Sequence, residues 1–204
     1  MADNYKIQFQ NAQKCFLTYD QDKLIRKFRL KADADFLYTT MYGSPYRLNR
    51  HTGGLERFDE AWVDANTFAE VMTLLDILCD SREDRWLTGR WVSTQMFGKY
   101  FHSGLLEPTF DALADAFDKT PGALEKACKA LGGHRIKGGD EAYAVEVMDG
   151  LEIGIFFWHA DEEFPAQIRF FWDENALMYI HYETMHYTLG YLRGLLKQAI
   201  EKRA

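Results

Sequence analysis

The sequence predicts an α+β fold, with an antiparallel β-meander in the C-terminal half packed with several amphipathic helices. Three observations carry this prediction. Apolar residues recur at helical spacing near both ends of the chain, they alternate with a period of two between Ala142 and Trp172, and strands and helices do not alternate singly as in βαβ units. The strands are therefore expected to pair with their sequence neighbours.

The N-terminal half should hold helices on either side of a few short strands. Apolar residues at helical spacing predict a helix over about residues 4–18, and Asp20 is placed to cap a second helix. Residues 35–58 combine β-branched and aromatic residues with Gly and Pro, which predicts two or three antiparallel strands. Thr67 and Glu70 fit a capping box that begins the next helix.

Two short helices are predicted in the middle of the chain. The apolar stripe of the first begins at Phe110, and in the second Thr120 is expected to be the cap and Pro121 the first helical residue. Gly132-Gly133 should end that second helix. The preceding residues 82–106 show no clean period.

Three alternating segments predict the strands of the meander, from Tyr143 to Val147, from Ile153 to Phe157 and from Ile168 to Trp172. Asp149-Gly150 suits a type I′ turn between the first two. A long amphipathic helix is predicted over residues 181–200. Its apolar stripe includes Leu189, Leu192 and Leu196.

Composition predicts one α+β domain over residues 1–204, in which residues 1–30 form an N-terminal helical segment. The chain has 47% hydrophobic and 27% charged residues, as ordinary globular proteins do, whereas 15% aromatic residues is a high share. The sequence contains no run of about 18 apolar residues, which a membrane span would require, and its N-terminus does not resemble a secretion signal. We therefore expect a cytoplasmic protein that does not bind membranes.

The formal net charge of −7 argues against general nucleic-acid binding, which depends on clustered Lys and Arg. Residues 1–50 are nevertheless basic, with nine Lys or Arg against five Asp. Much of this excess lies between Asp22 and Lys31, where it forms either a solvated helix face or a docking face for an acidic partner. A protein partner or a small molecule is thus the expected ligand.

Cysteine and histidine spacings predict no metal centre. Cys15, Cys79 and Cys128 lie far apart among helical patterns, where buried reduced thiols are usual. His181 and His186 are five residues apart, which turns them about 140° from each other on a helix. Two His ligands on one helix would need a spacing of four, so we interpret both as ordinary helix residues.

Three consecutive carboxylates, Asp161, Glu162 and Glu163, lie between two aromatic-rich strands. In a hairpin connection they would be solvated and would oppose aggregation at the edge of the sheet. Alternatively, they would line a ligand cleft beside Trp158 and His159. At most two would serve such a site, Asp161 and Glu163, because alternate residues of an extended chain share a side.

Two further segments are candidate ligand sites. Thr88, Arg90 and Trp91 form either a structural turn or a ligand wall, in which the ring supplies apolar area and Arg90 binds an anion. The Gly pairs around residues 134–137 form either a helix cap and a turn or an anion site that uses Arg135 or Lys137.

A family resemblance rests on LTGRWVS at residues 87–93, LGGHRIKGGDEAY at residues 131–143 and FFWHADEEFPAQIRFFWDENA at residues 156–176. In this order and spacing they resemble DUF3786, a family of prokaryotic proteins of unknown function. Some relatives are joined to, or encoded near, iron–sulfur and corrinoid-dependent one-carbon proteins of anaerobes. The resemblance implies a link to such metabolism and supplies no catalytic residues.

Two functional hypotheses follow. The first is a binding or accessory protein linked to corrinoid or one-carbon metabolism. The second is a metal- or carboxylate-dependent enzyme that uses Asp161, Glu162, Glu163 and His159 as acid–base or metal-binding groups. No specific reaction or cofactor is predicted.

Overall fold

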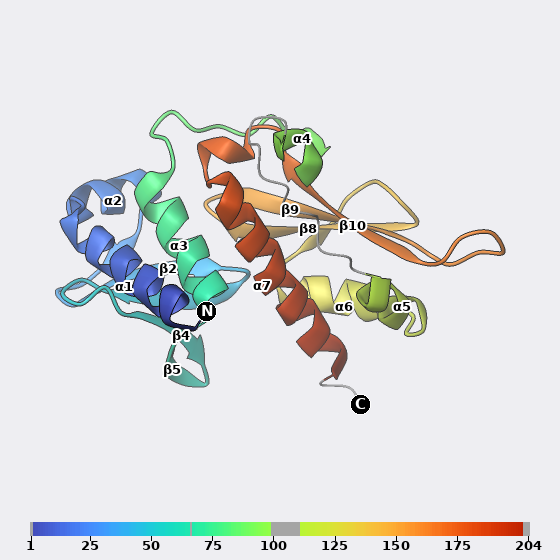
Figure 1. Ribbon diagram of the computed structural model, residues 1–204, viewed down its shortest axis with the longest axis horizontal. Helices are drawn as coiled ribbons and strands as arrows, with labels where there is room; N and C mark the ends of the chain where they lie inside the picture. The colour runs from blue at the N-terminus through green and yellow to red at the C-terminus, as the bar shows by residue number, and fades with distance from the viewer. Residues whose placement is uncertain (1, 66, 99–110, 202–204) are drawn as a thin grey trace. The chain divides into compact units, whose positions relative to one another are not determined.

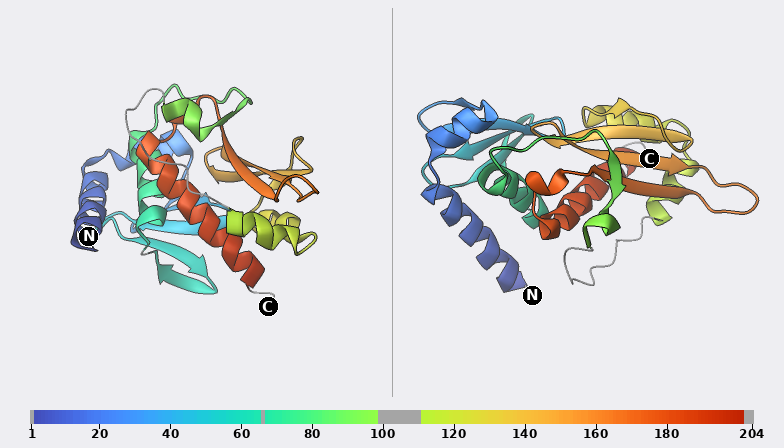
Figure 2. Two further views of the ribbon diagram at one scale, coloured as in Figure 1. Left: turned by 45° about the vertical axis from the view of Figure 1, so that its right-hand side comes forward. Right: turned by 90° about the horizontal axis from the view of Figure 1, so that it is seen from above.

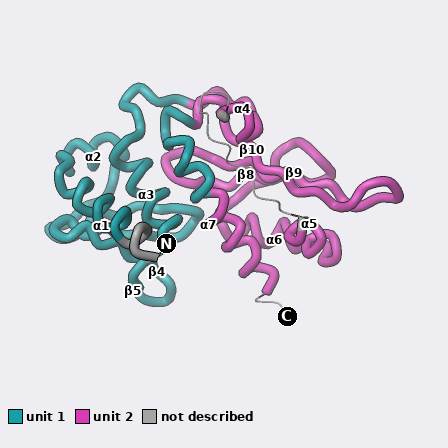
Figure 3. The backbone as a smooth tube through the Cα atoms, in the orientation of Figure 1, with its two compact units in different colours: residues 1–86, 177–188 teal, residues 87–176, 189–204 magenta. Residues whose placement is uncertain are grey.

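The computed structural model describes residues 2–65, 67–98 and 111–201. The chain divides into two compact units (Figure 3). Unit 1 consists of Met1–Trp86 with Leu177–Thr188, and unit 2 consists of Leu87–Ala176 with Leu189–Ala204. The boundary at Thr188 falls inside the last helix. The single-domain organisation stays a prediction, because two compact units can still unfold as one.

In the described residues up to Trp86, unit 1 contains three helices and five strands. Figure 1 shows how these helices and strands follow one another. They are α1 (Ala2–Thr18), α2 (Gln21–Phe28), β1 (Lys31–Ala32), β2 (Phe36–Met41), β3 (Ser44–Asn49), β4 (Leu55–Asp59), β5 (Ala61–Asp64) and α3 (Phe68–Asp80). The strands pair antiparallel in the order β1-β2-β3-β4-β5. The strands predicted over residues 35–58 are confirmed as β2, β3 and β4, and β1 and β5 extend the sheet on either side.

The helix starts of unit 1 follow the predicted capping. The Asp20 side chain accepts a hydrogen bond from the backbone of Lys23 at the start of α2. Thr67 is the N-cap of α3 and accepts from the backbone of Glu70. The Glu70 carboxylate is itself buried, where it accepts a hydrogen bond from the hydroxyl of Tyr46 at 2.7 Å. The cap therefore also joins α3 to the sheet.

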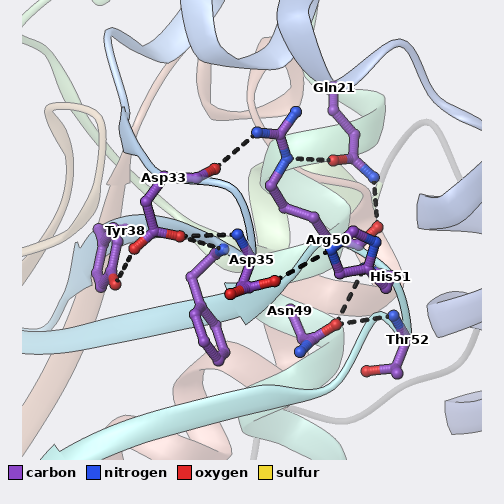
Figure 4. Close-up of polar contacts among 9 residues, drawn as sticks. Gln21, Asp33, Asp35, Tyr38, Asn49, Arg50, His51 and Thr52 are labelled. Atoms are coloured by element: carbon purple, nitrogen blue, oxygen red, sulfur yellow. Dashed lines mark hydrogen bonds and ion pairs between the residues drawn. The ribbon is translucent and has the colours of Figure 1, made fainter.

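A polar network holds the start of α2 to the turns before β2 and after β3 (Figure 4). The Asp33 carboxylate accepts from the hydroxyl of Tyr38 and from two backbone N–H groups. Arg50 donates to the Asp33 carbonyl and to the side chain of Gln21. These groups satisfy one another, which indicates that this network is structural. Docking of an acidic partner on the cations of α2 stays a prediction.

Unit 2 is built on a second antiparallel sheet, ordered β6-β10-β9-β8-β7. Its elements are β6 (Trp91–Ser93), α4 (Thr94–Gly98), α5 (Asp111–Asp118), α6 (Ala123–Ala130), β7 (His134–Arg135), β8 (Glu141–Met148), β9 (Leu151–Trp158) and β10 (Gln167–Asp173). A short 3₁₀ helix (Ala176–Met178) and α7 (Tyr182–Glu201) follow, and both cross the boundary between the units. The predicted β-meander is confirmed in β8, β9 and β10, as is the α+β class.

One face of the second sheet forms a core. Register places Val145, Ile153 and Trp172 on this face, and all three are fully buried. Helix α6 packs beside β8, and α5 packs beside β10. Asp149 and Gly150 both have positive φ, 54° and 79°, as the predicted type I′ turn requires. The predicted stripe of α7 is also buried, at Leu189, Leu192 and Leu196.

Two sequence predictions were wrong, and one lies outside the described residues. Helix α6 begins at Ala123, because Gly122 before it has a φ of 70° that no helical residue adopts. Thr120 therefore does not cap it, and its carbonyl instead accepts from Ala123 in a turn that contains Pro121. Cys15 is exposed rather than buried. Phe110 is not among the described residues.

No helix in the described part of the chain is long and apolar enough to cross a membrane.

Candidate functional sites

Aromatic side chains line the second face of the unit 2 sheet. Phe156 and Trp158 alternate on β9 with their ring centroids 6.4 Å apart, and Phe171 of β10 meets the Phe156 ring at 4.6 Å. Arg169 is the cross-strand partner of Phe156, so its side chain emerges on the same face. These partly exposed rings form an aromatic row.

Trp91 belongs to the far end of this face. It pairs with Asp173, and a Cβ at Gly154 would approach its ring to 3.1 Å, so the Trp91 ring lies directly over that glycine. Along β10, Asp173 lies six residues from Gln167, the cross-strand partner of Trp158, or roughly 20 Å. The acidic loop and the Thr88–Trp91 turn thus share a sheet face but not a cleft.

The contacts of Thr88 and Arg90 are with the end of β10. The buried Asp173 carboxylate accepts hydrogen bonds from the backbone and hydroxyl of Thr88 and from the backbone of Gly89 at 2.7 Å. Arg90 forms an ion pair with Glu174. These contacts satisfy a buried charge and fix the turn, which gives both residues a structural role.

Figure 2 shows in orange the loop that joins β9 to β10. A pocket of about 380 Å³ lies beside this loop. We call it the loop pocket. It is lined by Asp140, Trp158, His159, Asp161, Phe164, Pro165, Gln167 and Arg169. Of the residues selected from the sequence in this loop, Trp158, His159 and Asp161 therefore come together, whereas Glu163 is exposed and outside the lining.

The Asp161 carboxylate folds the loop. It accepts hydrogen bonds from the backbone N–H groups of Glu163 at 2.8 Å and Phe164 at 2.7 Å, and both bonds lower the pKa of Asp161. The backbone of Asp161 also donates to the carbonyl of Phe164. The loop is therefore a turn rather than an extended segment, so alternation does not place Asp161 and Glu163 on a shared side.

His159 lies among three carboxylates of unit 2. Its Nδ1 lies 2.8 Å from Asp118, its Nε2 lies 3.4 Å from Glu141, and its backbone donates to Asp140. The hydrogen bond with Asp118 is the largest cause that raises the pKa of His159, and it outweighs the opposing effect of burial. An imidazolium here is balanced by its protein neighbours.

Arg169 brings a positive charge to the loop pocket. Its guanidinium lies 5.7 Å from the centroid of the Trp158 ring and donates to the Gln167 side chain at 2.9 Å. Both of these partners are neutral, and Arg169 is exposed. The pocket thus offers a cation next to a large ring.

The glycine-rich segment before β8, which includes Gly138, packs against the same aromatic row. A Cβ at Gly138 would lie 2.0 Å from the Phe156 ring, and Gly138 has a φ of 144°. Only glycine allows this approach. Arg135 and Lys137 are exposed, and an anion site at either residue stays a prediction.

A cavity of about 360 Å³ lies in unit 1, and we call it the helix cavity. Its lining comes from α1, α3 and the start of α7 and consists of Gln8, Asn11, Ala12, Cys15, Met72, Leu75, Asp76, Cys79, Asp80, His181 and Thr184. Asp76, Asp80 and His181 each offer a ligand atom, and these atoms all lie within 4.8 Å of one another. Sequence reasoning missed this group, because His181 lies 105 residues from Asp76.

Asp76 and His181 form the closest contact in the helix cavity. The buried Asp76 carboxylate accepts from the His181 backbone at 2.9 Å and lies 2.5 Å from its Nδ1. Burial lowers the pKa of His181, but the Asp76 charge and hydrogen bond raise it more, so the net shift is upward. Asp80 accepts a hydrogen bond from Tyr19 at 2.8 Å.

Two thiols share this cavity. Cys15 is exposed and Cys79 is half-buried, and burial raises the pKa of Cys79 to about 12. Cys128, in unit 2, is buried as predicted, and burial raises its pKa to about 12. Both Cys79 and Cys128 are therefore protonated at neutral pH.

These features define an α+β protein with two antiparallel sheets, an aromatic pocket in one unit and a carboxylate–histidine cavity in the other. The chain belongs to the family described as domain of unknown function (DUF3786), which matches residues 20–194. No curated protein and no solved structure matches the chain.

Proposed function

We propose that the protein binds a small anionic ligand with a planar ring, and that the loop pocket is the binding site. The observation that carries the proposal is the placement of Arg169 beside the face of Trp158 in a pocket of about 380 Å³. A ring of the ligand would stack on Trp158 while a carboxylate or phosphate of the ligand pairs with Arg169. The volume is in the range of small-molecule sites.

The hydrogen bonds of the charged residues that line the pocket support an anionic ligand, because the carboxylates already accept hydrogen bonds from the protein and the cation of Arg169 is not paired with an acid among the described residues. The Asp161 carboxylate accepts from two backbone N–H groups, and the Asp140 carboxylate accepts from the backbone of His159. His159 is paired with Asp118. Of the two basic side chains in the lining, His159 is therefore paired with a carboxylate, whereas the described contacts of Arg169 are with neutral partners, so the Arg169 charge can pair with a ligand.

The alternative of an enzyme based on the acidic loop has less support. Its mechanism requires carboxylates that converge on one reacting group or ion. Asp161 instead holds the turn, and Glu162 and Glu163 are exposed and outside the pocket lining. The link to corrinoid or one-carbon metabolism and the cytoplasmic location remain expectations, of which the first guides the choice of ligands to test.

Isothermal titration calorimetry tests the proposal. The panel contains nucleoside monophosphates and aromatic carboxylates that include pterin derivatives. We expect one class to bind the wild-type protein, and Arg169→Gln and Trp158→Leu each to weaken that binding about tenfold or more, because each removes one of the two proposed contacts.

The matched control is Arg26→Gln, which removes an exposed arginine from α2 in unit 1. It should leave the affinity unchanged. The proposal is contradicted if no panel member binds the wild-type protein, or if Arg169→Gln binds as tightly as the wild type.

A further inference from the structure

We propose that Asp76, Asp80 and His181 bind one divalent first-row transition-metal ion in the helix cavity. The site lies in unit 1 and uses no residue of the loop pocket, so it is independent of the proposed ligand site. Three features carry the inference: the geometry of the ligand atoms, the chemistry of the donors and the open space beside them.

Helix α3 provides two of the ligands. Asp76 and Asp80 are four residues apart, so their carboxylates project from the same side of the helix one turn apart. His181 immediately precedes α7, and the bond from its backbone to Asp76 fixes its position against α3. Two segments that are distant in the sequence thus present three donors to one point.

The distances fit a site that closes on an ion. The three ligand atoms lie within 4.8 Å of one another. Oxygen and nitrogen ligands at about 2.0–2.2 Å from a tetrahedral ion lie about 3.4 Å apart. Side-chain movements of about 1 Å would therefore bring the set to metal-binding geometry. Asp80 is exposed, and in this movement its carboxylate would exchange the hydrogen bond from Tyr19 for the ion.

The donor set selects the class of ion. Ca²⁺ and Mg²⁺ prefer oxygen ligands alone, whereas imidazole favours Zn²⁺ and its first-row neighbours. A dication would also relieve the repulsion between Asp76 and Asp80, whose carboxylates lie within the same 4.8 Å group. Zn²⁺ is the simplest member of this class, because it accepts mixed carboxylate and imidazole ligands.

The cavity leaves room at the ion. About 360 Å³ of space adjoins the three donors, so three protein ligands would leave a coordination position for water or a small ligand. Cys15 and Cys79 line the same space and are the competing donors, since thiolates bind Zn²⁺ strongly. The experiment must therefore separate a carboxylate–histidine site from a thiolate site.

Calorimetric titration of the metal-free protein with Zn²⁺ tests the proposal, and visible absorption of the Co²⁺ form reports the coordination. The variants are Asp80→Asn and His181→Gln. The second keeps the backbone bond from residue 181 to Asp76, so the start of α7 is preserved. Far-UV circular dichroism checks that each variant is folded. If Asp80→Asn does not fold, His181→Gln decides.

The matched control is His51→Gln. His51 also pairs with an aspartate of unit 1, Asp35, at 3.3 Å (Figure 4). Both residues are exposed, and they belong to no group of three ligands among the described residues. If any exposed histidine beside an aspartate bound Zn²⁺, His51 would bind it as readily as His181 does. The control therefore separates such surface binding from binding in the helix cavity.

We expect the wild-type protein to bind one equivalent of Zn²⁺. Asp80→Asn and His181→Gln should each lower the affinity about tenfold or more, and His51→Gln should leave the affinity unchanged. Absence of saturable binding to the wild-type protein overturns the proposal. The proposal is also overturned if Cys15→Ser or Cys79→Ser abolishes Zn²⁺ binding while Asp80→Asn and His181→Gln bind Zn²⁺ as the wild type does. Failure of the loop-pocket ligand would leave these outcomes unaffected.

Discussion

Each pocket contains a histidine that contacts a carboxylate from a distant part of the chain. His159 lies 41 residues after Asp118, and His181 lies 105 residues after Asp76. In both cases the carboxylate raises the pKa of the imidazole. The charge of each histidine is therefore set by tertiary structure.

Asp118→Asn should lower the pKa of His159, because the Asp118 hydrogen bond is the largest cause of its upward shift. A raised pKa means that the folded state holds the proton more tightly than the unfolded state. The associated stability is fully present below the ordinary value of 6.5 and is lost as the pH rises through the folded pKa. The contribution is small, since His159 is exposed.

Proton NMR of the histidine ring signals across the pH range measures this change. The resonance of His159 is assigned by its absence from His159→Gln. His51 provides the internal control, because its pair with Asp35 lies in unit 1 and is untouched. An identical titration midpoint for His159 in the wild type and in Asp118→Asn would show that Asp118 does not raise the pKa of His159.

The sequence identified site residues only where they are neighbours in the chain. Trp158, His159 and Asp161 were selected together because they adjoin the acidic loop, and they line one pocket. Arg169 was missed, because its approach to Trp158 depends on the register of β9 with β10. The group around Asp76 was missed for the same reason, since periodicity within one helix does not report on partners outside it.

At the level of elements, α7 depends on its buried stripe. Leu192→Ala should lower the free energy of unfolding by about 2–5 kcal/mol, because Leu192 is fully buried and the truncation leaves a cavity. Gly194→Ala on the same helix should raise it by about 0.5–1 kcal/mol, since this exposed glycine has no atom within 4 Å of an added Cβ.

Urea denaturation of the two variants beside the wild type measures both effects. Both variants introduce alanine into the same helix, so a loss at residue 192 beside a gain at residue 194 would separate the effect of burial from that of helix propensity. A loss below about 0.5 kcal/mol for Leu192→Ala would contradict its burial in solution.

Long elements were predicted well from periodicity, and short ones were not. The three strands of the meander and α7 each span seven or more residues, enough for a period to be visible. Strands β1 and β7 have two residues each, and pairing with a neighbouring strand defines them rather than any pattern of their own. The start of α6 was misplaced because Thr120 and Pro121 also suit the turn that precedes it.

At the level of the whole molecule, we expect a single unfolding transition. Both units contain part of α7, and a helix that loses one half of its packing loses much of the support for the other half. Leu74→Ala in unit 1 and Leu192→Ala in unit 2 should therefore lower the same midpoint. Both side chains are fully buried.

Scanning calorimetry tests this expectation by comparing the calorimetric enthalpy with the van't Hoff enthalpy. Equal values support one cooperative domain over residues 1–204. Two resolved transitions, each moved by only one of the two variants, would show two independent domains instead.

The division of α7 also bears on how the gene can be shortened. Unit 1 takes residues 177–188 from a part of the chain that follows nearly all of unit 2. A fragment that ends at Trp86 would lose the Thr188 hydroxyl that bonds Thr73, and it would leave the buried Asp76 without His181. No contiguous stretch of codons encodes unit 1 alone, so a gene shortened at one end cannot express this unit in its present form. Unit 2 is discontinuous as well, since residues 189–204 follow the second segment of unit 1, so neither unit can be produced as one contiguous fragment.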